Sequence, residues 1–192
     1  MNDRPGQAGD ALPGPEGQSP RQFLAAAYDA FGPGLYRYAL VVTVDHAAAE
    51  DAVQQAFVNL ARMGRRVLAI ESCERYLRTA VRNECWRIIE RRRRESQPMG
   101  ATPTMPLLEA APASPFDEDE RSRVEAAVVA LPPEQREVVY LKVYEDWTFQ
   151  RIAEWLNVPM NTVASRYRYA IDKLRRQLIA EDVSLDHSPR SH

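Results

Sequence analysis

The stretch TFQRIAEWLNVPMNTVASRYR, residues 148–168, decides the fold of the second half of this chain. Thr148 can cap a first helix through its hydroxyl, and Asn157 can take the left-handed conformation in which helices commonly end. Pro159 and Asn161 then begin a second helix. The apolar positions recur at helical spacing and are expected to face inward: Ile152, Ala153, Leu156, Val163, Tyr167 and Ala170. The stretch therefore predicts a helix-turn-helix.

The outer face of the second helix is polar and basic, which suits contact with duplex DNA. In a helix-turn-helix the N-terminal half of the second helix enters the major groove, where its side chains meet base edges and phosphates. The DNA-contacting residues predicted on this basis are Asn161, Thr162, Ser165, Arg166, Arg168, Tyr169 and Lys173. The alternative interpretation is an ordinary helical hairpin that binds no DNA.

Basic and acidic residues are unevenly spread along the chain, although the formal net charge of its 192 residues is only -2. Residues 62–94 contain eleven arginines and four glutamates, whereas residues 95–120 contain six acids and no base. Bases again outnumber acids, by six to two, in residues 148–178. Two basic regions separated by an acidic one indicate contact with a polyanion at two places.

The pattern of apolar and helix-breaking residues predicts an all-α protein made of two small helical bundles. Residues 20–95 show amphipathic stripes, interrupted at Gly32-Pro33-Gly34 and resumed before a helix capped by Asp45, and predict a bundle of about four helices. Residues 96–116 are Pro-rich and without periodicity, and predict a flexible linker that can reach roughly 65 Å. Residues 117–180 predict the second bundle. Residues 1–19 and 181–192 are expected to be disordered tails.

A second candidate nucleic-acid site lies on the predicted helix YLRTAVRNECWRIIERRRR, residues 76–94. Aromatic and arginine side chains together suit single-stranded or unstacked bases, because the rings stack on bases and the arginines attract phosphates. Each aromatic residue taken alone is better explained by core packing, and the arginine run by a solvated helix end. The combination on one helix favours a site for unpaired nucleic acid.

The sequence gives little sign of other chemistry. Its two cysteines, Cys73 and Cys85, and its scattered histidines form no metal-ligand spacing, so we expect neither a metal nor a cofactor. No phosphate-binding loop or nucleophile–base pair points to an enzyme. Cysteine usage, the lack of a signal segment and the lack of a membrane-spanning apolar run predict a cytoplasmic protein without membrane insertion.

Three motifs, in this order, resemble the extracytoplasmic-function (ECF) group of bacterial RNA polymerase sigma factors. They are AEDAVQQAFVNL at residues 49–60, YLRTAVRN at residues 76–83 with the arginine run that follows, and LPPEQREVV at residues 131–139 with the helix-turn-helix that follows. The resemblance covers residues 22–178 and implies a protein that lends core RNA polymerase its promoter specificity.

The resemblance implies a role for each motif. The first docks on the clamp of the polymerase β′ subunit, and its matching residues are Asp51, Gln54, Gln55 and Phe57. The second recognises and melts the −10 element, with residues Arg78, Arg82, Asn83, Trp86, Arg87 and Arg91 on its helix. The third meets the β flap and reads the −35 element. The two promoter elements lie about two helical turns, roughly 70 Å, apart. The implied partners are core RNA polymerase, promoter DNA and an anti-sigma factor.

This chain departs from the family at several positions, and other functions stay open. Family members usually carry Glu at the position of Gln55, often Trp at that of Tyr76, and often Lys or Arg at that of Ala164. The main alternative is a stand-alone helix-turn-helix regulator, for which the chain shows no dimerisation or sensing domain. A decoy that titrates an anti-sigma factor is disfavoured because the DNA-facing arginines are abundant.

Overall fold

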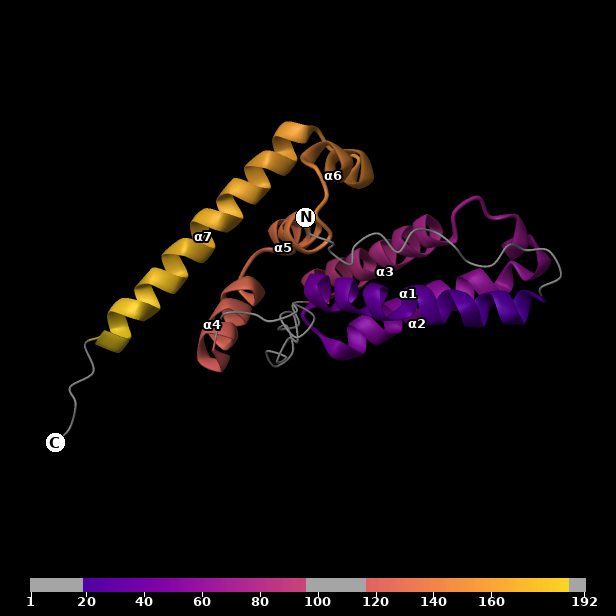
Figure 1. The fold of residues 1–192 in the computed structure, drawn as a ribbon, viewed down its shortest axis with the longest axis horizontal. Helices are drawn as coiled ribbons and strands as arrows, with labels where there is room; N and C mark the ends of the chain where they lie inside the picture. The colour runs from indigo at the N-terminus through magenta and orange to yellow at the C-terminus, as the bar shows by residue number, and fades with distance from the viewer. Residues whose placement is uncertain (1–18, 96–116, 187–192) are drawn as a thin grey trace, which may run out of the picture. The chain divides into compact units, whose positions relative to one another are not determined.

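The computed structural model describes residues 19–95 and 117–186, in which helices joined by short loops form the regular structure and no strand occurs (Figure 1). The chain divides into two compact units, residues 1–103 and 104–192. This arrangement confirms the predicted all-α fold with two helical bundles. The expected linker at 96–116, most of the N-terminal tail and residues 187–192 lie outside the described residues.

Unit 1 is built from three long helices that pack on one another in every pairing. They are α1 (Pro20–Thr43), α2 (His46–Arg62) and α3 (Cys73–Glu95), and a short 3-10 helix, η1 (Gly64–Ala69), joins α2 to α3. The most deeply buried side chains come from all of these elements, as expected for one continuous core: Ala27, Val41, Val42, Leu60, Val67, Leu77, Val81 and Cys85.

Helix α1 runs unbroken through Pro33, so the expected interruption at Gly32-Pro33-Gly34 was wrong. A proline inside a helix removes one backbone hydrogen bond. Here the apolar face on both sides of the proline is buried, with Phe23 before it and Leu35 after it. Burial of that face outweighs the local preference of the glycines and the proline, since most helix stability in proteins comes from tertiary packing. The bundle consequently has three long helices rather than four.

Asp45 caps helix α2, as predicted, and it also binds the far end of α3. Its Oδ1 accepts a hydrogen bond of 2.7 Å from the backbone N–H of Ala48. Its Oδ2 lies 3.0 Å from the Nη2 atom of Arg92. Burial raises the pKa of the Asp45 carboxyl, but the Ala48 N–H and the Arg92 guanidinium favour the charged form, and the net pKa lies below its ordinary value.

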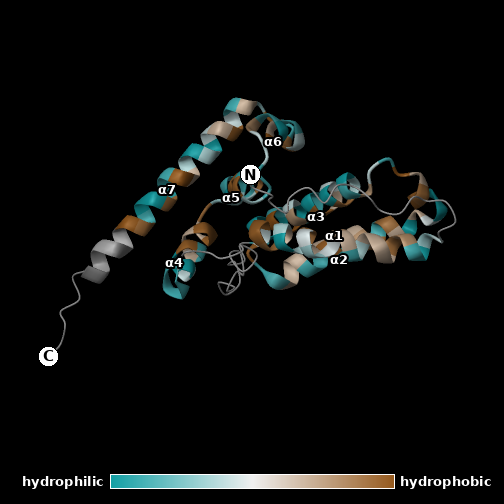
Figure 2. Cartoon of the chain, in the orientation of Figure 1, coloured by the Kyte–Doolittle hydropathy of each residue, from teal (hydrophilic) through white to brown (hydrophobic). Residues whose placement is uncertain are grey.

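Unit 2 consists of a long C-terminal helix against which three shorter helices pack. The short helices are α4 (Glu118–Val129), α5 (Pro133–Val139) and α6 (Phe149–Leu156), and the long helix is α7 (Met160–Asp186). Helix α5 continues into a π-helical turn, η2 (Tyr140–Tyr144). Apolar and polar positions alternate along α7 in Figure 2, as expected for a helix that is buried on one side.

Helix α7 ends later than predicted. It continues to Asp186, whereas the sequence pattern placed the end of the bundle at residue 180 and a tail from residue 181. The reason is that the sequence contains neither Gly nor Pro between Pro159, just before α7, and Pro189, just after it. With no breaker present, the helix has no local signal to stop.

Two cations bind the carbonyl groups at the C-terminal end of α4. The Nη1 atom of Arg136 donates to the carbonyls of Val129 (2.6 Å) and Leu131 (2.9 Å). The Nζ atom of Lys173, from α7, donates to the carbonyl of Ala130 (2.6 Å). Arg136 is 1% exposed, and this burial lowers the pKa of its guanidinium to about 10. The last carbonyls of a helix have no partner within it, so these bonds fix α4 to α5 and α7.

Candidate nucleic-acid and polymerase interfaces

Helices α6 and α7 form the predicted helix-turn-helix. Thr148 caps α6, its hydroxyl oxygen accepting from the backbone N–H of Arg151 at 3.1 Å. Asn157 ends α6 in the left-handed conformation, with φ 52°. Ala153 and Val163 are buried, and the two helices that carry them pack against each other. A small residue at this place lets the second helix approach closely, which sets the angle of the motif.

The residues predicted to contact duplex DNA lie along α7, and most of them are accessible. Asn161, Arg168 and Tyr169 are exposed, whereas Thr162, Ser165 and Arg166 are half-buried. The guanidinium of Arg168 lies 5.2 Å from the centre of the Tyr169 ring, within the range of a cation–π contact. The two side chains together form a basic and aromatic surface patch on the exposed side of α7.

Lys173 differs from the other predicted contacts because its ammonium group is bonded to the carbonyl of Ala130. Tyr167 also has a packing partner, since its ring lies 5.4 Å from that of Phe149, centre to centre. Both residues thus hold α7 against the rest of unit 2. Sequence spacing placed Lys173 beside the outer face, but it could not show that a helix end lies within reach of the side chain.

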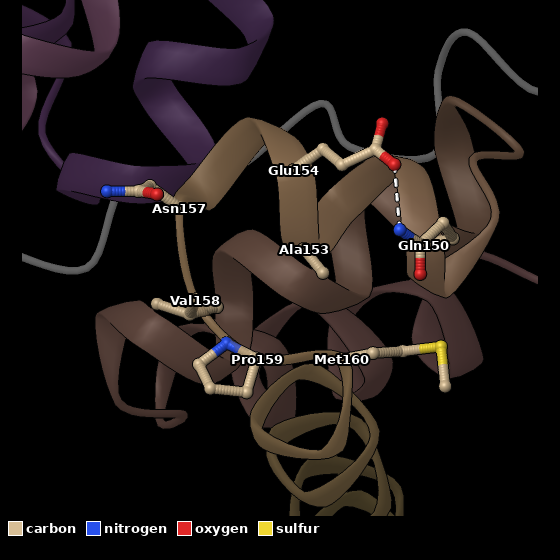
Figure 3. A pocket seen from close by; sticks show the side chains of 7 residues that line it. All are labelled: Gln150, Ala153, Glu154, Asn157, Val158, Pro159 and Met160. Carbon is tan, nitrogen blue, oxygen red and sulfur yellow. Dashed lines mark hydrogen bonds between the residues drawn. The ribbon is translucent and has the colours of Figure 1, made fainter.

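A shallow groove of about 430 Å³ separates α6 from the first turn of α7 (Figure 3). The amide nitrogen of Gln150 donates to the carboxylate of Glu154 at 2.7 Å along the α6 side. Met160, the first residue of α7, borders the groove and is 49% exposed. Met160 carries no polar or charged group, so nothing in the sequence marked it as a DNA contact.

The residues predicted to meet the −10 element form two neighbouring stripes on α3. Positions 78, 82 and 86 lie one turn apart, and so do positions 83, 87 and 91, because residues four apart share a helix face. In the first stripe the guanidinium of Arg82 lies 5.9 Å from the centre of the Trp86 ring. In the second stripe Asn83, Arg87 and Arg91 are all exposed.

Several of these α3 side chains make short-range contacts within the helix. The Nε atom of Arg78 lies 2.7 Å from Oε1 of Glu74. The Nη2 atom of Arg87 lies 2.5 Å from Oε2 of Glu84. Trp86 is half-buried, and its indole N–H has no hydrogen-bond partner in the described structure. This N–H is itself buried, so the ring face of the half-buried indole, beside the Arg82 guanidinium, is the part of Trp86 that can stack on a base.

The predicted polymerase-binding residues lie on α2. Asp51 and Gln54 are exposed, whereas the side-chain amide of Gln55 donates to Oδ1 of Asn59 at 2.9 Å. The ring of Phe57 meets that of Tyr28 edge to face, with centres 5.3 Å apart. Gln55 and Phe57 are therefore partly occupied by contacts within unit 1.

Two exposed apolar residues that were not predicted from the sequence extend this surface. Tyr28 on α1 is 57% exposed and Val58 on α2 is 42% exposed. Val58 could have been found, because it follows Gln54 by one helical turn. Tyr28 could not, since nothing in the sequence shows that α1 brings it beside Phe57.

The described residues contain no cluster of three or more His, Cys, Asp or Glu side chains able to hold a metal ion. None of the helices in the described ranges is long and apolar enough to cross a membrane. Cys73 and Cys85 are both buried as free thiols. Burial raises the pKa of the Cys73 thiol to about 11.

Two family models match parts of the chain. The model of sigma-70 region 4 matches residues 127–176, which span α5, α6 and the helix-turn-helix. A model described as cytochrome b558 alpha-subunit matches residues 15–135. The second match crosses from unit 1 into unit 2 and ends inside α5, so it corresponds to no structural unit.

Relatives match along most of the chain. The ECF RNA polymerase sigma factor SigL of Mycobacterium tuberculosis is 32% identical over 162 residues, which cover 81% of this chain and 88% of SigL. The RNA polymerase sigma-E factor of Streptomyces coelicolor is 31% identical over 160 residues, covering 78% of this chain and 82% of that factor.

A solved structure shares the fold. The sigma factor RpoE of Bartonella quintana, crystallised with the anti-sigma factor NepR, superposes with a TM-score of 0.59 at 22% identity, covering 82% of this chain and 95% of RpoE. The helix-turn-helix, the match to sigma-70 region 4 and the relatives that extend across both units all agree with the resemblance seen in the three motifs. The chain belongs to the ECF family of RNA polymerase sigma factors.

Proposed function

We propose that this sigma factor binds core RNA polymerase and contacts a promoter at two separate places, one for each unit. The observation that carries the proposal is the different construction of the two basic helices. Helix α7 is the second helix of a helix-turn-helix, which suits the major groove of duplex DNA. Helix α3 combines a half-buried indole with arginines, which suits unstacked bases.

On this proposal, α3 opens the −10 element and binds its single strand. Flipping a base out of the stack costs a few kcal/mol, which contacts to the freed base and its backbone have to offset. Trp86 with Arg82 offers a stacking face and a positive charge. Exposed Asn83 offers an amide that can pair with a base edge, and Arg87 and Arg91 continue as a track for phosphates.

The exposed side of α2 is the proposed docking surface for the β′ clamp of core polymerase. Asp51 and Gln54 supply its polar part, and Tyr28 with Val58 supplies an apolar part next to Phe57. A polar rim around aromatic residues is the usual anatomy of a protein interface. Unit 2 is proposed to meet the β flap and the −35 element.

The chain is further proposed to act in the cytoplasm, where core polymerase works, and to be controlled by an anti-sigma factor. Support for the second point is the fold shared with RpoE of Bartonella quintana, which was crystallised with NepR. A protein that covers the two units would compete with both polymerase and DNA. The anti-sigma partner would then act as a reversible inhibitor.

The first test is binding of the purified full chain to core RNA polymerase by analytical ultracentrifugation. We expect tight, stoichiometric association. An Asp51→Ala/Gln54→Ala variant should weaken it about tenfold, which corresponds to ~1.4 kcal/mol for two polar interface positions truncated together. A matched control is Arg65→Ala in η1, an exposed residue of unit 1 that is not among those proposed to contact polymerase or DNA. Absence of association, together with sequence-specific duplex binding by the chain alone, would favour the stand-alone regulator.

A second test separates the two DNA-contacting roles within the holoenzyme. Asn83→Ala is expected to reduce permanganate reactivity of thymines in the −10 region more than it reduces closed-complex formation. Arg166→Ala is expected to reduce use of the −35 element while leaving core binding unchanged. If both variants instead lose core binding, the proposed assignment of the two units to promoter contacts is wrong.

A further inference from the structure

We propose that Met160 and the groove beside it form a subsite for a thymine base, with the Met160 side chain contacting the 5-methyl group. The inference rests on the proposed function, in which α7 enters the major groove of the −35 element. It adds an apolar readout position to a helix whose predicted contacts are otherwise polar or aromatic.

The place of Met160 in the motif carries the first step. Met160 is the first residue of α7, and the N-terminal residues of the second helix are those that reach base edges in a helix-turn-helix. It is also one of the few large apolar side chains of the described residues that are strongly exposed, at 49%. In Figure 3 its side chain extends along the mouth of the groove rather than into the core of unit 2.

The lining of the groove decides between a phosphate and a base as its occupant. Glu154 stands on the α6 side and carries a carboxylate held by the Gln150 amide at 2.7 Å. That negative charge repels a phosphate. Of the remaining lining residues, Ala153, Val158 and Pro159 are apolar, and Asn157 is polar but uncharged. The groove is therefore suited to an uncharged, partly apolar group.

Thymine is the base that meets this requirement. In the major groove its C5-methyl is the apolar group that the four bases present, and side chains read it by apolar contact. A methionine suits such contact because its unbranched, polarizable thioether adapts to the shape of its neighbour. Exposed Asn161, the next residue on α7, can bind a polar base edge beside it.

The test uses the holoenzyme of the full chain and a promoter library randomised over the −35 region. We expect the wild-type holoenzyme to favour T about fourfold at one position. Met160→Ala should lose that preference and keep the preferences at the other positions. Replacing this T by deoxyuridine, which lacks only the methyl group, should weaken wild-type binding about fourfold and leave Met160→Ala unaffected. One buried methyl corresponds to about this factor, ~0.8 kcal/mol.

Ile179→Ala is the matched control, because Ile179 is a similarly exposed apolar residue (56%, against 49% for Met160) on the same helix, far from the groove. It should retain the full sensitivity to deoxyuridine. The inference is overturned if wild-type holoenzyme binds thymine and deoxyuridine promoters equally, or if Met160→Ala keeps the T preference. A holoenzyme without base preference anywhere in the −35 region contradicts the proposed function as well, so the two failures are distinguishable.

Discussion

Each of the two basic helices uses one cation to stabilise its own unit, but the partner of that cation differs. In unit 1, Arg92 of α3 binds the carboxylate of Asp45, which is also the cap of α2. In unit 2, Lys173 of α7 binds a neutral carbonyl at the end of α4, next to the two carbonyls held by Arg136. One anchor is an ion pair and the other is a set of hydrogen bonds to backbone dipoles.

The number of basic residues therefore overstates the surface that is available to DNA. Arg92 belongs to the run of four arginines at the end of α3, yet its guanidinium faces a carboxylate rather than solvent. Lys173 occupies a DNA-facing position by sequence spacing, yet its ammonium caps another helix. The comparison also predicts that the anchor in unit 1 responds to acid and that the anchor in unit 2 does not.

The largest effect is expected for Arg136→Leu. The substitution leaves the carbonyls of Val129 and Leu131 without their donor in a buried place, and removing one member of such a buried group costs ~3 kcal/mol or more. The free energy of unfolding of unit 2 should fall by about that amount. Urea denaturation followed by tryptophan fluorescence measures it, in a Trp86→Phe background where Trp147 and Trp155 report on unit 2 alone.

Unit 1 provides the control for Arg136→Leu. Its unfolding, followed by Trp86 fluorescence with both tryptophans of unit 2 replaced by Phe, should be unchanged, because the two units have separate cores. A loss of less than about 0.5 kcal/mol in unit 2 would contradict the anchoring role, since surface substitutions already cause changes of that size.

The sequence predicted the elements governed by local signals. The cap at Thr148, the left-handed Asn157 and the inward positions Ala153 and Val163 all lie within one short motif, where spacing determines which residues meet. Asp45 as a cap was predicted for the same reason. These features need only a few neighbouring residues to be recognised.

The sequence failed where distant contacts decide the outcome. The glycines and proline near Pro33 are strong breakers locally, yet burial on both sides keeps α1 continuous. The pairing of Asp45 with Arg92 joins residues 47 positions apart, and that of Lys173 with Ala130 joins residues 43 apart. The contact between Tyr28 and Phe57 likewise joins residues that lie far apart in the sequence. Periodicity along one helix carries no information on which other helix end lies near it.

A medium effect, which depends on pH, is expected at Asp45. Asp45→Ala removes both the cap and the ion pair and should lower the stability of unit 1 by about 1–2 kcal/mol at pH 7. Asp45→Asn keeps a good capping residue and should lose less, since it removes only the charge that pairs with Arg92. Thermal and urea unfolding of the two variants and the wild type measure the difference.

The sign of the pH dependence follows from the lowered pKa of the Asp45 carboxyl. A group whose folded pKa is depressed stabilises the protein fully above its unfolded pKa, about 3.9. That stabilisation is lost as the pH falls through the folded pKa. The gap between wild type and Asp45→Asn should thus be constant from pH 7 to about pH 5 and shrink below about pH 4. A gap independent of pH down to pH 2 would contradict the ion pair.

The smallest effect is expected on the salt dependence of promoter binding, which distinguishes an anchoring cation of α7 from a DNA-facing one. Arg168 is exposed, whereas Lys173 is bonded to the carbonyl of Ala130. Arg168→Ala should reduce the salt dependence of holoenzyme binding to promoter DNA, changing the slope of log K against log salt by about 1, because one phosphate contact is lost. Lys173→Met should leave that slope unchanged and lower the stability of unit 2 by less than about 1 kcal/mol, since the bond is partly open to solvent. Equal changes of slope for the two variants would show that Lys173 leaves the carbonyl when DNA binds. The anchor in unit 2 would then be a contact exchanged on the promoter, unlike the fixed anchor formed by Asp45 and Arg92.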